Sequence, residues 1–286
     1  MFTDDAVTPI RLEILVDLLR ECRQGLPREE AYRLLQPGPL GGDRPTFIPA
    51  KATVRAGLEL HLIEEEGGKL SLDGTCRKEK DAQTAILAAF DQLVLCCTTV
   101  EKYLALFYSY YLGLGQEVYR RRTQSGEQWA DQFNRQVFRD VAQENRFNAT
   151  KLTGLYRWLN YVGLGWYDPA DAFQANPYER LRRALPIVFG RQRKLDADGF
   201  MTKLTATCPE LDGGEIFLQA NHEWQPSEKE CTLGLSHSLI ELHLDGIIRL
   251  NCPADSTGWS IGEAEPPRDD DFRSDRFAGI ELLSRE

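Results

Sequence analysis

The fold is decided by residues 50–72, which read AKATVRAGLELHLIEEEGGKLSL. The first part predicts a helix over about residues 50–61. Two short runs follow, residues 62–66 and 69–72, and the Gly67-Gly68 pair between them is typical of the tight turn of a β-hairpin. The stretch therefore predicts a helix that leads directly into a hairpin.

Two helices are expected before this stretch. Thr8-Pro9 has the form of an N-cap followed by proline at the first helical position. Apolar residues then recur at helical spacing up to Leu19. A second helix is expected from Pro27, and the Pro- and Gly-rich residues 37–42 form a loop.

Three helices and a terminal hairpin over residues 8–75 resemble the winged-helix form of the helix-turn-helix family. Proteins of that family place the third helix in the major groove of DNA and the hairpin, or wing, against its backbone. The sequence departs from this pattern at residues 64–66, where three glutamates in the wing would repel phosphate. A protein-docking module is the alternative interpretation. The resemblance implies DNA contacts by Lys51, Thr53, Arg55 and, near the wing tip, Lys69.

The middle of the chain is expected to be helical, with a second copy of the pattern. A long buried helix is predicted over residues 80–113 and an amphipathic helix over residues 126–145. A further helix begins near residue 149 and leads into a hairpin-like stretch at residues 166–176. It would present Lys151, Thr153 and Arg157 as the second set of DNA contacts.

A third and fainter copy is expected near the end of the chain. It consists of a helix over residues 233–244, a strand at 246–251, a turn at 254–258 and a return strand at 259–262. The expected fold class is therefore mainly α with short β-hairpins, as tandem winged-helix domains joined by a helical middle. The expected domains are 1–78, 79–203 with the second winged-helix-like unit, and 204–286 with the third.

The charge of the chain is unevenly distributed. The 286 residues are 42% hydrophobic and 27% charged, as in an ordinary soluble globular protein, and the net charge is −10. Almost all of the excess acid lies in the last 83 residues, so the net charge does not exclude nucleic acid for the rest. Arg120, Arg121 and Arg122 form a basic cluster that could neutralise phosphates, or a solvated face, or a partner for the acidic C-terminal region. That region could occupy the basic clusters when DNA is absent.

Several classes of protein do not fit the sequence. The N-terminus has no secretory pattern, and charged residues interrupt the most apolar stretch, so no membrane partner is expected. The chain has seven cysteines, an odd number that does not suit a disulfide framework, and no C-x-x-C motif occurs. This favours reduced thiols and a cytoplasmic protein. No motif for a nucleotide cofactor, a metalloprotease or a serine hydrolase occurs. We therefore expect no catalytic residues, no cofactor and no metal, with a metal enzyme built on the Cys and His residues of 208–252 as an alternative.

The helical middle, the repeated wings and the ending together resemble one family. The ending consists of the Pro-Pro-Arg-Asp-Asp-Asp run at 266–271 and the segment 277–282. The chain is similar to DpdG-like accessory proteins of bacterial clusters that insert 7-deazaguanine derivatives into DNA and restrict foreign DNA. The resemblance implies a non-catalytic component that binds double-stranded DNA or docks onto other proteins of such a system. The alternative is a transcription regulator of the winged-helix class that acts as a dimer, and a homo-oligomer is left open.

Overall fold

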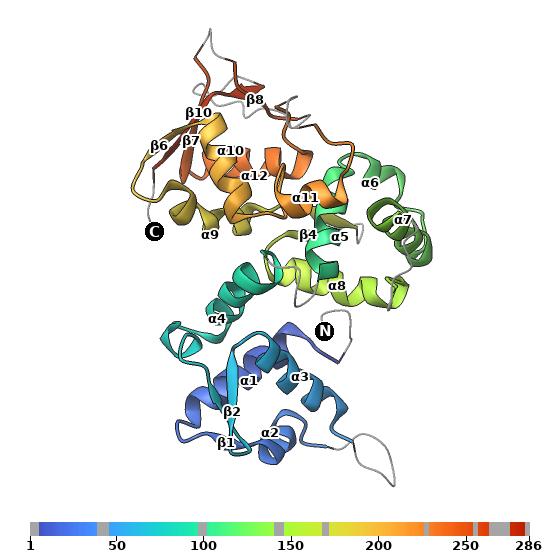
Figure 1. Cartoon of the computed structure of the whole chain (residues 1–286), viewed down its shortest axis with the longest axis vertical. Coiled ribbons are helices and arrows are strands. Elements are labelled where there is room, and N and C mark those ends of the chain that lie inside the picture. Colours follow the sequence, from blue (N-terminus) through green and yellow to red (C-terminus); the bar gives the residue numbers. More distant parts are fainter. Residues whose placement is uncertain are drawn as a thin grey trace. The chain divides into compact units, whose positions relative to one another are not determined.

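The chain forms two compact units. The first consists of residues 1–104 and 149–161, and the second of residues 105–148 and 162–286. Most described residues are helical and the sheets are small and antiparallel, which confirms the mainly α fold class with short hairpins (Figure 1). The computed structural model describes residues 6–38, 46–96, 102–139, 146–167, 172–225, 229–253, 257–262 and 275–283.

The first unit contains the helices and the hairpin that the sequence predicts. Its sheet has the order β1-β3-β2, and Gly67 and Gly68 at the β2–β3 turn have φ of +58° and +76°, as a tight hairpin requires. The short strand β1, which pairs with β3, was not anticipated. The elements are α1 (Pro9–Glu21), β1 (Leu26–Pro27), α2 (Arg28–Leu35), α3 (Ile48–Glu59), β2 (Ile63–Glu66), β3 (Lys69–Leu72), a 3-10 turn (Cys76–Lys78), α4 (Ala82–Ala89), a π-helical turn (Phe90–Val94) and α8 (Ala149–Tyr161).

Helix α8 belongs to the first unit because its aromatic residues pack there. The Trp158 ring stacks on Phe90 with their centroids 4.9 Å apart, and its Nε1 donates a hydrogen bond to the Val7 carbonyl. At the end of the helix, the Tyr161 hydroxyl donates to the Glu13 carboxylate at 2.6 Å. A buried indole that finds an acceptor for its N–H stabilises such a docking.

The second unit carries three small sheets. One is three-stranded with the order β6-β10-β7, and the pairs β4–β5 and β8–β9 form the other two. The elements are α5 (Lys102–Gly113, of which residues 105 onward belong to this unit), α6 (Glu117–Arg120), α7 (Gly126–Phe138), β4 (Gly165–Tyr167), β5 (Phe173–Ala175), α9 (Tyr178–Phe189), β6 (Lys194–Asp196), α10 (Ala197–Thr207), α11 (Glu215–Ala220), α12 (Leu233–Leu244), β7 (Ile248–Asn251), β8 (Trp259–Ser260), β9 (Arg276–Phe277) and β10 (Gly279–Leu282).

One arrangement of elements occurs in both units. The order helix, strand, helix, helix, strand, strand is α1-β1-α2-α3-β2-β3 in the first unit and α9-β6-α10-α12-β7-β10 in the second, where α11, β8 and β9 are added (Figure 1). In both sheets the last strand lies between the other two. In both, the second helix also begins at the residue after the first strand, at Arg28 and at Ala197. We call residues 9–72 the first module and residues 178–282 the second module.

The third predicted hairpin is wrong. The helix over 233–244 and the strand after it are confirmed, but β7 pairs with β10 and β8 pairs with β9. The β7–β10 pairing places Leu250 opposite Ile280 and Ile248 opposite Leu282, so that the apolar side chains of both strands are buried together. The true partner strand begins at Gly279, twenty residues beyond the start of the predicted return strand at 259–262.

Other expectations for the middle of the chain also change. Helix α8 and the β4–β5 hairpin belong to different compact units, so the second predicted copy does not form one domain. The long helix expected over 80–113 is seen as α4, a π-helical turn and α5, and residues 97–101 lie outside the described part. The expected domain boundary at residues 203–204 falls inside α10. The acidic run at 269–271 also lies outside the described residues.

Candidate nucleic-acid interface

Helix α3 displays two cations on its outward side. Its buried face consists mainly of small residues, which allows close packing against α1 and α2. Lys51 and Arg55 are exposed and lie four residues apart, which places them one above the other on the surface. The Arg55 guanidinium lies 3.7 Å from the Glu59 carboxylate, and the Lys51 ammonium lies 5.8 Å from the centroid of the Tyr32 ring. Both charges remain at the surface, where a phosphate could reach them.

The expectation that Thr53 faces DNA is wrong. Its side chain is fully buried, and its hydroxyl donates a hydrogen bond of 2.8 Å to the carbonyl of Pro49, one turn earlier in α3. A threonine in a helix commonly satisfies its hydroxyl in this way. Position 53 lies between the two exposed cations in sequence, and the helical period of 3.6 residues turns it toward the core.

The wing is less acidic than its sequence indicates. Glu65 accepts a hydrogen bond of 2.9 Å from Arg28, and Glu64 lies 3.5 Å from Arg77. Glu66 is opposite Lys69 in the β2–β3 register, and Lys69 is exposed as predicted. Exposed ion pairs contribute little to stability, but these cations offset the repulsion that three glutamates would exert on phosphate.

Arg28 was missed by the sequence reasoning. Its Nε donates to the Tyr32 hydroxyl, and this hydrogen bond is the main cause that raises the pKa of Arg28. Its guanidinium also reaches Glu65 on β2, so that it joins the second helix of the module to the wing. No local signal indicated this role, because Arg28 pairs with Glu65 across 37 residues and such tertiary pairing cannot be read from spacing.

The predicted contacts on α8 are not presented together. Lys151 is buried and its ammonium lies 5.1 Å from the centroid of the Tyr103 ring, so the expectation that it faces DNA is wrong. Thr153 is exposed and Arg157 is half-buried. The face of α8 that packs within the first unit includes the position of Lys151, which explains the difference.

The arginine cluster 120–122 is divided among three surroundings. Arg120 pairs with Glu117 on the same helix. Arg121 donates to the Tyr110 hydroxyl at 2.9 Å and to the Gln132 side chain at 3.0 Å, and the Arg122 guanidinium lies 4.8 Å from the centroid of the Tyr119 ring. The three charges therefore have different partners within the second unit, and their contact with DNA stays a prediction.

The equivalent helix of the second module has a different surface. Helix α12 reads LGLSHSLIELHL and contains no lysine or arginine. Its Glu241 accepts a hydrogen bond of 2.9 Å from Asn176, next to β5, and a Cβ added to Gly234 would lie 2.8 Å from the Ala175 carbonyl oxygen. The β4–β5 hairpin thus covers part of one side of α12.

No group of three or more His, Cys, Asp or Glu side chains within the described segments could hold a metal ion. The alternative of a metal enzyme on residues 208–252 therefore gains no support from the Cys and His side chains there. Among the same residues, every helix is too short or too polar to cross a bilayer.

These features define a class: a mainly helical protein with two modules of the same topology, of which the first displays a cationic helix. The chain belongs to the DpdG-like family, whose family model matches residues 2–256. This match confirms the family resemblance and gives the chain a role in a DNA-modification system of several components. The ending at residues 266–282, which contributed to the resemblance, lies beyond the match. No curated protein and no solved structure matches the chain.

Proposed function

We propose that both modules are winged-helix domains and that the first binds duplex DNA. The order of three helices and three strands supports this, as does the position of the last strand in the middle of each sheet. In this fold the third helix enters the major groove and the β2–β3 wing lies beside the backbone. Helix α3 and the turn at Gly67-Gly68 are the corresponding elements here.

The observation that carries the proposal is the exposure of Lys51 and Arg55 on α3. Two cations one helical turn apart can contact phosphates or donate hydrogen bonds to the O6 and N7 atoms of guanine in the major groove. Lys69 on the wing would contact the backbone, where the partly neutralised glutamates no longer oppose it. Arg120, Arg122 and Thr153, which are exposed, and Arg157, which is half-buried, remain proposed secondary contacts.

The chain would act as a non-catalytic component of its DNA-modification system. The second module supports this role, because α12 carries no cation for phosphate and is partly covered by β5. Its remaining surface would contact other proteins of the system or a second copy of the chain. Nothing in this role requires a cofactor.

Fluorescence anisotropy with a labelled duplex tests the proposal. We expect the full chain to bind duplex DNA at low salt, with an affinity that falls as salt rises. Lys51→Ala with Arg55→Ala should weaken binding about tenfold or more and reduce the salt slope by about two, since each phosphate contact contributes about 0.9 to that slope. The matched control is Arg191→Ala with Arg193→Ala, which removes the same charge from an exposed loop of the second module.

Equal losses in the two double variants would contradict the proposal, because binding would then depend on overall charge alone. Absence of duplex binding by the wild-type chain at low salt would also contradict it. Selection of one palindromic sequence from a random duplex library, together with a dimer in solution, would favour the alternative of a transcription regulator.

A further inference from the structure

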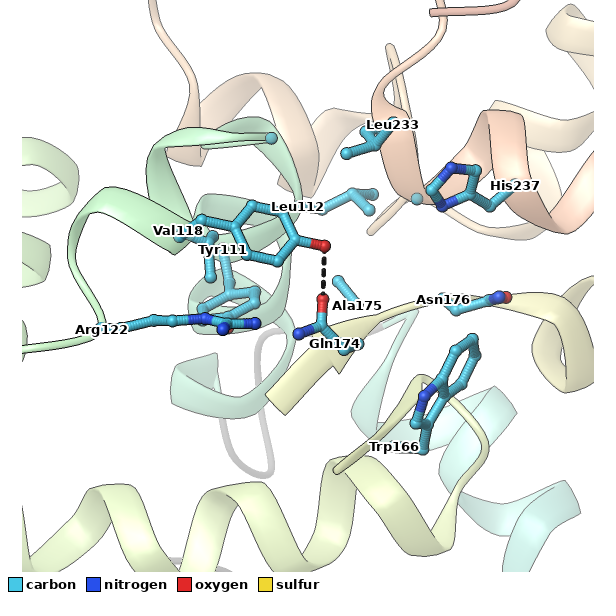
Figure 2. A pocket seen from close by; sticks show the side chains of 13 residues that line it. Tyr111, Leu112, Val118, Arg122, Trp166, Gln174, Ala175, Asn176, Leu233 and His237 are labelled. Carbon is cyan, nitrogen blue, oxygen red and sulfur yellow. Dashed lines mark hydrogen bonds between the residues drawn. The ribbon is translucent and has the colours of Figure 1, made fainter. Parts of the chain in front are cut away.

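A cavity of about 310 Å3 opens in the second unit, among α5, α6, the β4–β5 hairpin and the start of α12. Its volume lies within the range of sites for small molecules. Figure 2 shows the side chains around it, which come from four separate segments of the chain. The polar and aromatic ones are Tyr119, Arg122, Trp166, Gln174, Asn176 and His237.

The walls of the cavity are held in place by hydrogen bonds. The Tyr119 hydroxyl donates to Gln174 Oε1 at 2.8 Å, which joins α6 to β5 and is the dashed contact in Figure 2. Asn176 donates to Glu241 and accepts from the Ser238 hydroxyl at 2.6 Å, which joins the end of β5 to α12. A site built in this way before a ligand arrives loses little conformational entropy on binding.

Two aromatic rings are presented at this cavity. Trp166 is 45% exposed and Tyr119 is 43% exposed, although burial of such rings is strongly favourable. The Arg122 guanidinium lies 4.8 Å from the centroid of the Tyr119 ring, so that a cation is held beside the aromatic faces. Flat rings of this kind stack on planar ligands, and nucleic-acid bases are bound by such platforms.

The charge of the residues that line the cavity indicates which class of ligand it could bind. Among the residues that line the cavity in the described part of the chain there is no aspartate or glutamate, and Arg122 carries the one permanent charge. Burial lowers the pKa of His237, although Glu241 opposes this, so the imidazole is neutral at neutral pH. A neutral imidazole and an amide can each donate and accept hydrogen bonds, as the edge of a nucleobase requires.

We propose that this cavity binds one nucleotide. The base would stack on Trp166, its edge would face Gln174 and His237, and its phosphate would contact Arg122. A free nucleotide and a nucleotide within single-stranded DNA share this chemistry. The site lies wholly in the second unit, so the proposal does not depend on duplex binding by the first module.

Calorimetry on the full chain tests the proposal with three probes: deoxyguanosine monophosphate, a short single-stranded oligonucleotide and deoxyribose 5-phosphate, which has no base. We expect binding of one or both probes that carry a base and none of the third. Trp166→Ala should weaken that binding about tenfold or more, since stacking contributes roughly 1–3 kcal/mol per base. Tyr167→Ala is the matched control, because Tyr167 is the neighbouring exposed ring on β4 and does not line the cavity.

The outcomes separate the sources of the ligand. Binding of the free nucleotide alone identifies a free nucleotide as the ligand, and binding of the oligonucleotide alone identifies a nucleotide within a strand. Arg122→Gln should weaken binding of the monophosphate but not of deoxyguanosine, which keeps the test available if Trp166→Ala does not fold. The proposal is overturned if no base-bearing probe binds, if the base-free probe binds equally well, or if Trp166→Ala and Tyr167→Ala lose affinity equally. Lys51→Ala with Arg55→Ala should leave nucleotide binding unchanged, which separates this site from duplex binding.

Discussion

The two modules have the same topology but differ in how their third helix is used. Helix α3 carries Lys51 and Arg55 at the surface, whereas α12 has no lysine or arginine. The wing of the first module closes in two glycines, whereas residues 252–278 separate β7 from β10. The comparison shows that the same arrangement of elements can carry third helices of different charge, so topology alone does not assign a nucleic-acid contact. In the function proposed above, the charge and exposure of the third helix make the difference.

The largest expected difference between the two modules is the loss of stability when an ion pair is broken. In the second unit, Arg180 Nε lies 2.8 Å from Glu210, and their side chains are 3% and 0% exposed. Arg180→Ala would leave a buried carboxylate without its cation and should lower the free energy of unfolding by about 3–5 kcal/mol. Arg55→Ala, which breaks an exposed pair in the first module, should cost no more than about 0.5 kcal/mol. Chemical denaturation of both variants measures this, and similar losses would contradict the comparison.

The starts of the two third helices should differ in their response to pH. Thr232 caps α12 and donates its backbone N–H and its hydroxyl to the buried Asp212, whereas the N-cap residue of α3 is Phe47, which makes no side-chain cap. Burial raises the pKa of Asp212 to about 6 and outweighs these hydrogen bonds. The folded state therefore favours the protonated carboxyl. The protonated Asp212 carboxyl therefore contributes to the free energy of unfolding below about pH 4, and this contribution is lost as the pH rises through about 6.

Asp212→Asn tests this pH dependence. A shift in the pKa of Asp212 from 3.8 to about 6 corresponds to a change of about 3 kcal/mol in the free energy of unfolding between pH 4 and pH 7. The variant cannot titrate, so its free energy of unfolding should fall less than that of the wild-type chain between pH 4 and pH 7. Denaturation at several pH values gives the slope for each protein. Parallel slopes would show that another group causes the pH dependence.

A pair of glycine substitutions compares how tightly the third helices are packed. A Cβ on Gly234 of α12 would lie 2.5 Å from Leu112 Cδ1 and 2.8 Å from the Ala175 carbonyl oxygen, so the backbone would have to move. A Cβ on Gly57 of α3 would meet only side-chain carbons, at 3.1 Å. Gly234→Ala should cost about 1–3 kcal/mol. Gly57→Ala should change stability by less than about 1 kcal/mol, because the gain in helix propensity offsets the crowding. Thermal unfolding of the two variants provides the comparison.

Local patterns predicted much of the first module and less of the second. The caps, the helical period and the Gly67-Gly68 turn act over a few residues, so α1, α3 and the β2–β3 hairpin were predicted correctly. The partner of β7 could not be found in this way, because β10 is separated from it by 27 residues. Similarly, β6 pairs with β10 across more than eighty residues, and no local signal reports such pairing.

The candidate site was predicted in part for the same reason. The winged-helix resemblance assigned Lys51, Thr53 and Arg55 to the DNA-facing side, but the helical period separates Thr53 from the two cations, and the structure buries it. The burial of Lys151 followed from the docking of α8, which tertiary packing decides. The cavity beside Trp166 combines residues from four segments, so spacing along the chain could not indicate it.

The pairing of β10 also changes how the acidic C-terminal region can be tested. Deletion of residues 265–286 would remove the central strand of the second module, so a change in DNA affinity would report loss of the fold. Substitution of Asp269, Asp270 and Asp271 by asparagine keeps the strand. If the region occupies the basic clusters when DNA is absent, these three changes should raise the affinity for duplex DNA, and unchanged affinity would reject that idea.

Site-specific photo-crosslinking tests the difference between the two modules most directly. Ile48 on α3 and Leu244 on α12 are 61% and 55% exposed, so a photoreactive phenylalanine analogue can replace either one with little effect on packing. After irradiation with duplex DNA at low salt, we predict a covalent protein–DNA adduct for the variant at position 48 and none for the variant at position 244. An adduct at position 244 alone, or equal adducts at both positions, would contradict the assignment of duplex binding to the first module.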